Sequence, residues 1–128
     1  MLCFDGHNDL LFRLWETGDP EGAAFLASDG TGHIDLARAR HGGFCGGLFA
    51  LFAPSQGFED AFREAGVPDE APRPAEREAA LRAVLAQASI LHRMERSAPD
   101  ALRVCRTVEA IETAGDAVAD RRHFDHRR

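Results

Sequence analysis

Lysine is absent from this sequence, and all 15 of its basic residues are arginines. The chain is nevertheless acidic, with a formal net charge of −6 over 128 residues. A protein that binds nucleic acids in general needs a basic face that displaces counterions from the phosphates. The composition therefore argues against a nucleic-acid partner, whereas it leaves room for a small cationic or zwitterionic substrate.

Cysteine is scarce as well, and long apolar runs are missing. The chain has three cysteines, Cys3, Cys45 and Cys105, and no CxxC pair. This odd, widely spaced set indicates neither a zinc knuckle nor a disulfide framework. No apolar run approaches the roughly 18 residues of a membrane span, and residues 1–5 lack the basic and apolar regions of a secretory signal. We therefore expect reduced thiols, no membrane contact and a cytoplasmic location.

The rest of the composition is that of a globular domain, with 45% hydrophobic and 28% charged residues. The length corresponds to one domain, and the order of the apolar segments predicts an α/β fold with a parallel sheet. The expected elements are a buried strand at 2–4, a helix at 10–15, a short helical segment at 33–40, a buried strand at 44–53, a helical turn at 58–65, and helices at 75–96 and 107–114.

The sequence also predicts how some of these elements are built. The 75–96 helix carries apolar residues three and four positions apart, which is typical of a helix with one buried face. Gly46 and Gly47 permit close approach of a neighbouring backbone to the second strand, and Thr107 is expected to cap the last helix. The apolar positions of the 75–96 helix are Leu81, Val84, Leu85, Ala88, Leu91 and Met94.

His7 and Asp9 follow the first strand and are separated by one residue. In an extended segment, residues two apart project from the same face, which places an imidazole beside a carboxylate. These are suitable ligands for zinc or a similar divalent ion, and in a β/α barrel such strand ends line the catalytic mouth. The alternative from spacing alone is a surface turn with two solvated polar groups.

Two segments resemble one known family. Residues Phe4–Leu10 (FDGHNDL) are similar to the N-terminal signature of the membrane dipeptidase (renal dipeptidase) family, peptidase family M19. The segment from His33 to Gly43 is similar to that family's second landmark, a His-x-Asp-Leu stretch that leads through glycines into the second strand. That landmark does not bind zinc in the family, so we expect a structural, hydrogen-bonding role for His33 and Asp35.

The resemblance implies a TIM-like (β/α)8 barrel of the metallo-dependent hydrolase type that holds two zinc ions. It assigns His7 and Asp9 to the first zinc. It also implies a bridging glutamate at the end of the third strand and two zinc-binding histidines on later strands. The implied reaction is the hydrolysis of a dipeptide substrate by a metal-activated water.

The resemblance stops before the expected bridging glutamate. After residue 119 the chain continues as DRRHFDHRR, where no apolar strand ending in glutamate occurs and where we assign no metal role to His123 or His126. A β/α barrel takes about 250 residues. We therefore interpret residues 1–119 as the N-terminal part of an incomplete barrel and residues 120–128 as a charged, disordered tail, which makes the chain a truncated gene fragment or frameshift product. With at most one partial zinc site, it is expected to be inactive on its own.

Two alternatives remain open at this stage. The first is a non-catalytic α/β fragment that acts only through partner binding, since unpaired strands invite homo-oligomers or aggregation. The second is another metal-dependent, amidohydrolase-like barrel. That group usually opens with His-x-His, and Asp9 occupies the place of the second histidine.

Overall fold

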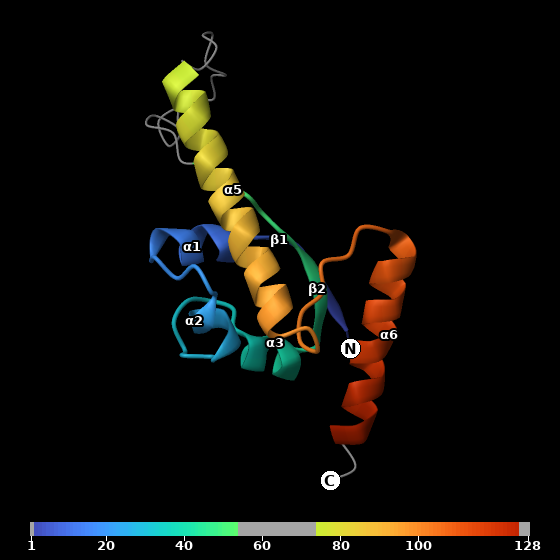
Figure 1. Cartoon of the computed structure of the whole chain (residues 1–128). Coiled ribbons are helices and arrows are strands. Elements are labelled where there is room, and N and C mark those ends of the chain that lie inside the picture. The colour runs from blue at the N-terminus through green and yellow to red at the C-terminus, as the bar shows by residue number, and fades with distance from the viewer. Residues whose placement is uncertain (1, 54–73, 126–128) are drawn as a thin grey trace, which may run out of the picture.

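Strands and helices alternate along residues 2–53 and 74–125, the part of the chain that this computed structural model describes (Figure 1). Short helices separate the two strands, and two long helices follow them. The elements are β1 (Cys3–Asn8), α1 (Leu10–Glu16), α2 (Ala23–Leu26), α3 (Leu36–Gly42), β2 (Phe44–Phe49), α5 (Pro74–Ser97) and α6 (Val108–Asp125). The helical turn expected at 58–65 lies outside the described residues.

β1 and β2 pair in parallel, as the sequence predicted, with Cys3 opposite Phe44 and Asn8 opposite Phe49. Gly46 and Gly47 make this pairing possible. A Cβ atom at residue 46 would lie 2.9 Å from the ring of Phe4, and one at residue 47 would lie 3.1 Å from Cβ of Asp5. The prediction that these two glycines permit a close approach is therefore confirmed.

The prediction that both strands are buried is wrong. Four of the six residues of β1 are exposed, and in β2 most residues are half-buried and Leu48 is exposed. The sheet has only two strands within residues 2–53 and 74–125, so few side chains cover it. Apolar composition located both strands, although β1 extends to Asn8 and β2 ends at Phe49 instead of residue 53. Their burial depends on neighbours that lie far away in the sequence.

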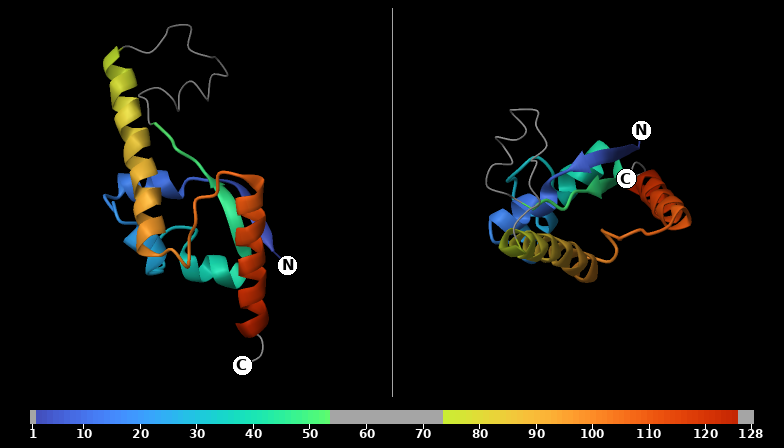
Figure 2. Two further views of the ribbon diagram at one scale, coloured as in Figure 1. Left: turned by 45° about the vertical axis from the view of Figure 1, so that its right-hand side comes forward. Right: turned by 90° about the horizontal axis from the view of Figure 1, so that it is seen from above.

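The core lies between α1, α2 and α5, on one side of the sheet. The buried cluster includes Leu11 and Leu14 of α1, Phe25 of α2, and Ile90 and Met94 of α5. α5 crosses α1, as the two views of Figure 2 show together with Figure 1. Phe49 of β2 packs against the same cluster, which ties the sheet to the helices.

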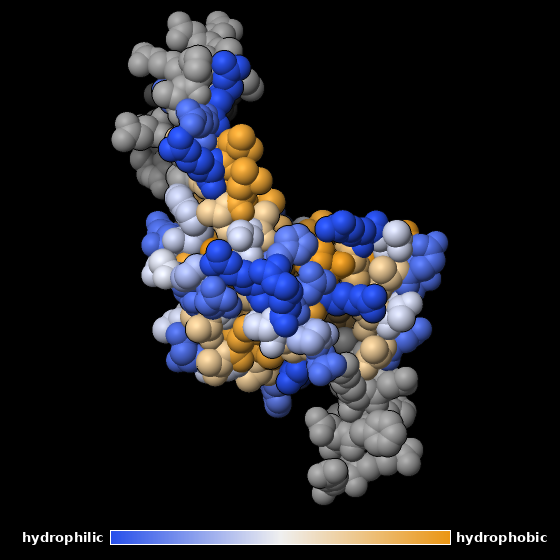
Figure 3. Space-filling view, in the orientation of Figure 1, coloured by the Kyte–Doolittle hydropathy of each residue, from blue (hydrophilic) through white to orange (hydrophobic). Residues whose placement is uncertain are grey.

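α5 is the long helix that the period of apolar residues predicted. Met94 is buried and Leu91 packs against the core, as expected, but two of the predicted positions are not buried. Leu81 and Leu85 are each 58% exposed, and an apolar stripe runs along the upper part of α5 in Figure 3. The buried stripe is instead Ala83, Gln87, Ile90 and Met94. Its polar member, Gln87, accepts a hydrogen bond from the Phe52 N–H (2.9 Å) and donates one to the Phe52 carbonyl (2.5 Å).

α6 begins where the sequence predicted and ends later. The Thr107 hydroxyl accepts a hydrogen bond from the Ala110 N–H at 3.2 Å, which confirms Thr107 as the N-cap. The helix then continues to Asp125, whereas we expected disorder from residue 120. Arginine is a good helix former, and a helix that is already nucleated propagates readily through polar residues. Residues 126–128 lie outside the described part, and the disorder of the 120–128 tail stays a prediction.

Across residues 2–53 and 74–125, no helix is long and apolar enough to cross a membrane. All three cysteines are free, with Cys3 exposed and Cys45 and Cys105 half-buried.

Candidate functional site

The candidate metal ligands meet where β1 passes into α1. His7 is the penultimate residue of β1, and Asp9 is the N-cap residue of α1. Nε2 of His7 lies 3.2 Å from Oδ1 of Asp9, and the two side chains are 69% and 67% exposed. The pair therefore presents an imidazole nitrogen and a carboxylate oxygen side by side at an open surface.

The backbone at Asp9 differs from the extended geometry that we assumed. Its φ and ψ are −104° and 25°, so the strand has already ended. Its side chain makes no capping hydrogen bond; instead the side-chain oxygen of Asn8 accepts one from the Leu10 N–H at 3.3 Å. The Asp9 carboxylate thus makes no capping bond, and it faces His7.

Asp5 and Asn8 hold this turn in place, and the sequence analysis assigned them no role. The Asp5 carboxylate accepts hydrogen bonds from the His7 N–H at 3.2 Å and from the Asn8 side-chain amide at 3.0 Å. On the β2 side, the Ala50 N–H donates to the Asn8 carbonyl at 2.9 Å. The signal that could have found them was their place inside the same FDGHNDL motif as the ligand pair.

No third ligand joins His7 and Asp9 within the part of the chain that the structure describes. No group of three or more His, Cys, Asp or Glu side chains there is arranged to hold a metal ion. His92, on α5, pairs with Glu95 at 3.3 Å instead. The geometry thus brings together the two predicted ligands, and no third candidate ligand joins them in this part of the chain.

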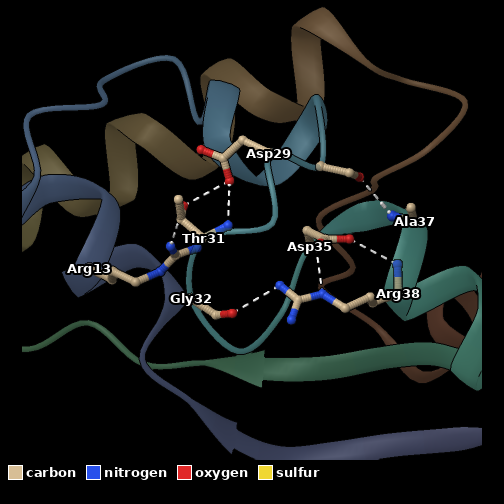
Figure 4. A network of polar contacts seen from close by, with 8 residues as sticks. Arg13, Asp29, Thr31, Gly32, Asp35, Ala37 and Arg38 are labelled. Atoms are coloured by element: carbon tan, nitrogen blue, oxygen red, sulfur yellow. Dashed lines mark hydrogen bonds and ion pairs between the residues drawn. The ribbon is translucent and has the colours of Figure 1, made fainter.

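The second His-x-Asp segment has a different role. The Asp35 carboxylate is 2% exposed and caps α3, where it accepts hydrogen bonds from the Arg38 N–H (2.8 Å) and guanidinium (2.6 Å) (Figure 4). These two bonds, the backbone bond above all, hold the pKa of the Asp35 carboxyl below its ordinary value. Because the Asp35 carboxylate is buried and already hydrogen-bonded, it is unavailable to a metal ion. His33 is exposed, so this His-x-Asp segment does not form a second ligand pair.

A neighbouring set of contacts fixes the loop before α3. The Arg38 guanidinium also donates to the Gly32 carbonyl at 2.9 Å. The Asp29 carboxylate accepts from both the N–H and the hydroxyl of Thr31, and this lowers the pKa of Asp29. Arg13 of α1 donates to the Thr31 hydroxyl at 3.2 Å (Figure 4). The loop is thereby tied to α1, directly after the candidate ligands.

Comparison with known proteins agrees with this arrangement. A sequence model of the membrane dipeptidase family (peptidase family M19) matches residues 1–119. A metallopeptidase of known structure, described as dipeptidase AC of family M19, is 38% identical with a TM-score of 0.70 over 92% of this chain. A metallopeptidase from Rhodobacter sphaeroides, solved with a phosphinate mimic of the dipeptide L-Ala-D-Ala, is 40% identical with a TM-score of 0.71 over the same share.

A protein from Acinetobacter calcoaceticus, described as an uncharacterized protein in the PQQ-III 3′ region, is 30% identical over 110 residues, or 85% of this chain. The chain spans only about a third of the length of these proteins: 35% of the Acinetobacter protein, and 32% and 36% of the two solved structures. Within that third, both the sequence and the α/β fold agree. The chain belongs to the membrane dipeptidase family, peptidase family M19.

Proposed function

We propose that this chain supplies His7 and Asp9 as two ligands of a zinc ion in a dipeptidase of the M19 type. The observation that carries the proposal is the 3.2 Å approach of the His7 imidazole to the Asp9 carboxylate at an exposed strand end. Family membership supports it, because the solved relatives are described as metallopeptidases. The corresponding substrate class is the dipeptide, which the ligand of the Rhodobacter structure mimics.

The chemistry of the two side chains fits zinc. Imidazole nitrogen and carboxylate oxygen are both common zinc ligands, whereas Mg²⁺ and Ca²⁺ prefer oxygen alone. A zinc ion in such a centre polarises a carbonyl group and lowers the pKa of a bound water. The residues of this chain orient the ligands: Asp5 holds the His7 backbone, and the Asp9 carboxylate makes no capping bond to α1.

We further propose that the chain corresponds to the first part of a (β/α)8 barrel and is inactive as a peptidase on its own. Catalytic zinc sites usually have three protein ligands, and only two are present in the described residues. The parallel β1–β2 pair with intervening helices supports the barrel assignment. Groups that contact the substrate would then come from the remaining part of such a barrel.

Zinc titration of the purified chain tests the ligand assignment. We expect at most one zinc per chain, with an affinity far below that of a complete site. His7→Ala and Asp9→Ala should each weaken binding about tenfold or more, because each removes one of two ligands. His33→Ala is the matched control, since it removes an exposed histidine from the other His-x-Asp segment. Equal losses for His33→Ala and His7→Ala would contradict the assignment.

A dipeptide hydrolysis assay with added zinc tests the inactivity. We expect no hydrolysis above the rate in buffer. Hydrolysis that rises with the zinc concentration and disappears in His7→Ala would show that the chain alone is a working catalyst, and it would overturn this part of the proposal.

Of the two alternative functions, the partner-binding role is the one that an observation supports. A non-catalytic, partner-binding role agrees with the exposed apolar side chains Phe4 and Leu48 on the sheet. The amidohydrolase-like alternative has no such support, because the sequence match is to the dipeptidase family and Asp9 stands where a second histidine would be expected.

A further inference from the structure

Two of the three cysteines lie next to each other on the neighbouring strands β1 and β2. Cys3, the first residue of β1, lies opposite Phe44 of β2. The next pair along the sheet joins Phe4 to Gly46. Cys45 is therefore an extra residue in β2, a β-bulge opposite Cys3. The Cys45 thiol donates a hydrogen bond to the Cys3 carbonyl at 3.2 Å, so its sulfur reaches the backbone of the residue that carries the other thiol.

The side chains of these two cysteines lie on the same face of the sheet. Side chains two apart in a strand share a face, which places Cys3 with Asp5 and Cys45 with residue 47. Asp5 and residue 47 share that face, because a Cβ atom at Gly47 would lie 3.1 Å from Cβ of Asp5. Residues one step out of register on strands about 4.8 Å apart have Cα atoms roughly 5.8 Å apart. That separation is within the range of about 4.4–6.8 Å that disulfides span.

The two thiols also differ in exposure in a way that suits disulfide exchange. All three cysteines are free, and Cys3 is exposed while Cys45 is half-buried. An exposed thiol is open to attack on a small oxidant, and a neighbouring thiol can then resolve the product. Cys105 is placed differently, on the connection between α5 and α6, where its thiol donates to the Ala110 carbonyl at 3.4 Å.

We propose that Cys3 and Cys45 form a reversible disulfide that fastens the start of β1 to β2 when the chain meets a low-molecular-weight disulfide such as oxidised glutathione. The Cys3 thiolate attacks one sulfur of oxidised glutathione, which forms a mixed disulfide and releases one reduced glutathione. The Cys45 thiolate then attacks the Cys3 sulfur and releases the second. Two protein thiols are oxidised in total, and one glutathione disulfide is reduced to two thiols that take up the two protons.

The bridge would act on a strand that is weakly held. Four of the six residues of β1 are exposed, and within residues 2–53 and 74–125 the strand pairs only with β2. A bond between residues 3 and 45 closes a loop that contains α1, α2 and α3, and it restricts the unfolded chain accordingly. It lies at the opposite end of β1 from His7, so the proposal does not depend on zinc binding. An exposed bridge of this kind is also readily reduced again.

The test is incubation of the purified chain with oxidised glutathione, followed by thiol counting and by mass spectrometry of a non-reduced digest. We expect the number of free thiols to fall from three to one and a peptide containing Cys3 to be linked to one containing Cys45. The thermal midpoint should rise by about 5–10 °C, and dithiothreitol should reverse the change.

Two serine variants make the test specific. Cys105→Ser is the matched control, and it should form the bridge and show the same rise of the thermal midpoint. Cys45→Ser should keep glutathione on Cys3 as a mixed disulfide and show no rise. Four results would overturn the proposal: thiols that do not react, a mixed disulfide at Cys3 that persists in the unsubstituted chain, a bridge that includes Cys105, and a disulfide that joins two chains.

Discussion

At the scale of single residues, carboxylates with the same sequence neighbourhood acquire different roles. Asp9 faces His7 at the surface, Asp5 binds the backbone of the turn, and Asp35 is buried as a helix cap. What separates them is the set of N–H groups within reach. Asp35 accepts two hydrogen bonds from Arg38 and holds α3 and its loop, whereas the Asp9 carboxylate makes no capping bond and faces His7.

A pH dependence of stability follows from Asp35. Its carboxyl has a lowered pKa in the folded chain, so its stabilising effect is full above the unfolded-state pKa of about 3.9. That effect is lost as the pH falls through the lower, folded-state pKa. Asp35→Asn should therefore lower the thermal midpoint by a few degrees at pH 6, and by progressively less as the pH falls and the Asp35 carboxyl becomes protonated.

Circular-dichroism melts between pH 2 and pH 6 check this prediction. Asp116→Asn changes the formal charge by the same amount at an exposed site on α6, and it should have little effect at either pH. A loss from Asp35→Asn that is equal at both pH values would show that the carboxylate charge plays no part.

At the scale of elements, α5 connects parts of the chain that are distant in sequence. Its Ile90 and Met94 pack on α1, while Gln87 bonds both backbone groups of Phe52, just beyond β2. Two turns further on, Glu95 accepts a hydrogen bond from the Val104 N–H at 2.8 Å, which lowers the pKa of Glu95. One helix thus holds the exit of β2 on one side and the start of the connection to α6 on the other.

Gln87→Leu tests this connection. The side chains are similar in size, but leucine leaves the N–H and C=O of Phe52 without their partner. We expect a loss of about 2 kcal/mol in the free energy of unfolding, since a buried polar group without a hydrogen bond costs about 1–3 kcal/mol. Urea denaturation of both proteins measures this difference in the free energy of unfolding.

Arg77→Leu is the control for the same helix. Arg77 is exposed on α5, so its replacement should change stability by no more than about 0.5 kcal/mol. If Gln87→Leu were neutral or stabilising, the amide would be a dispensable member of the core.

The helices show which features can be predicted from the sequence and which cannot. The start of α1, the long helix α5 and the Thr107 cap are local patterns, and each is confirmed. α2 was not expected: it has four residues, and its first N–H groups are bound by the Asp19 carboxylate at 3.0 and 2.8 Å. So short a helix has no apolar period to detect.

At the scale of the whole molecule, the chain shares its fold with two solved metallopeptidases but spans only about a third of their length. Within residues 2–53 and 74–125 its sheet has two strands, and four of the six residues of β1 are exposed. The buried core lies on the other side, between α1, α2 and α5.

The sequence by itself determined the family and the alternation of strands and helices, and it supplied the proposal that His7 and Asp9 are a ligand pair. These follow from motifs and periods within a few residues of each other. Only the tertiary structure decided that Leu81 and Leu85 of α5 are exposed while Gln87 is buried, and that most of β1 stays exposed. Those outcomes depend on competition for packing partners and hydrogen bonds between residues far apart in the chain, which no local pattern contains.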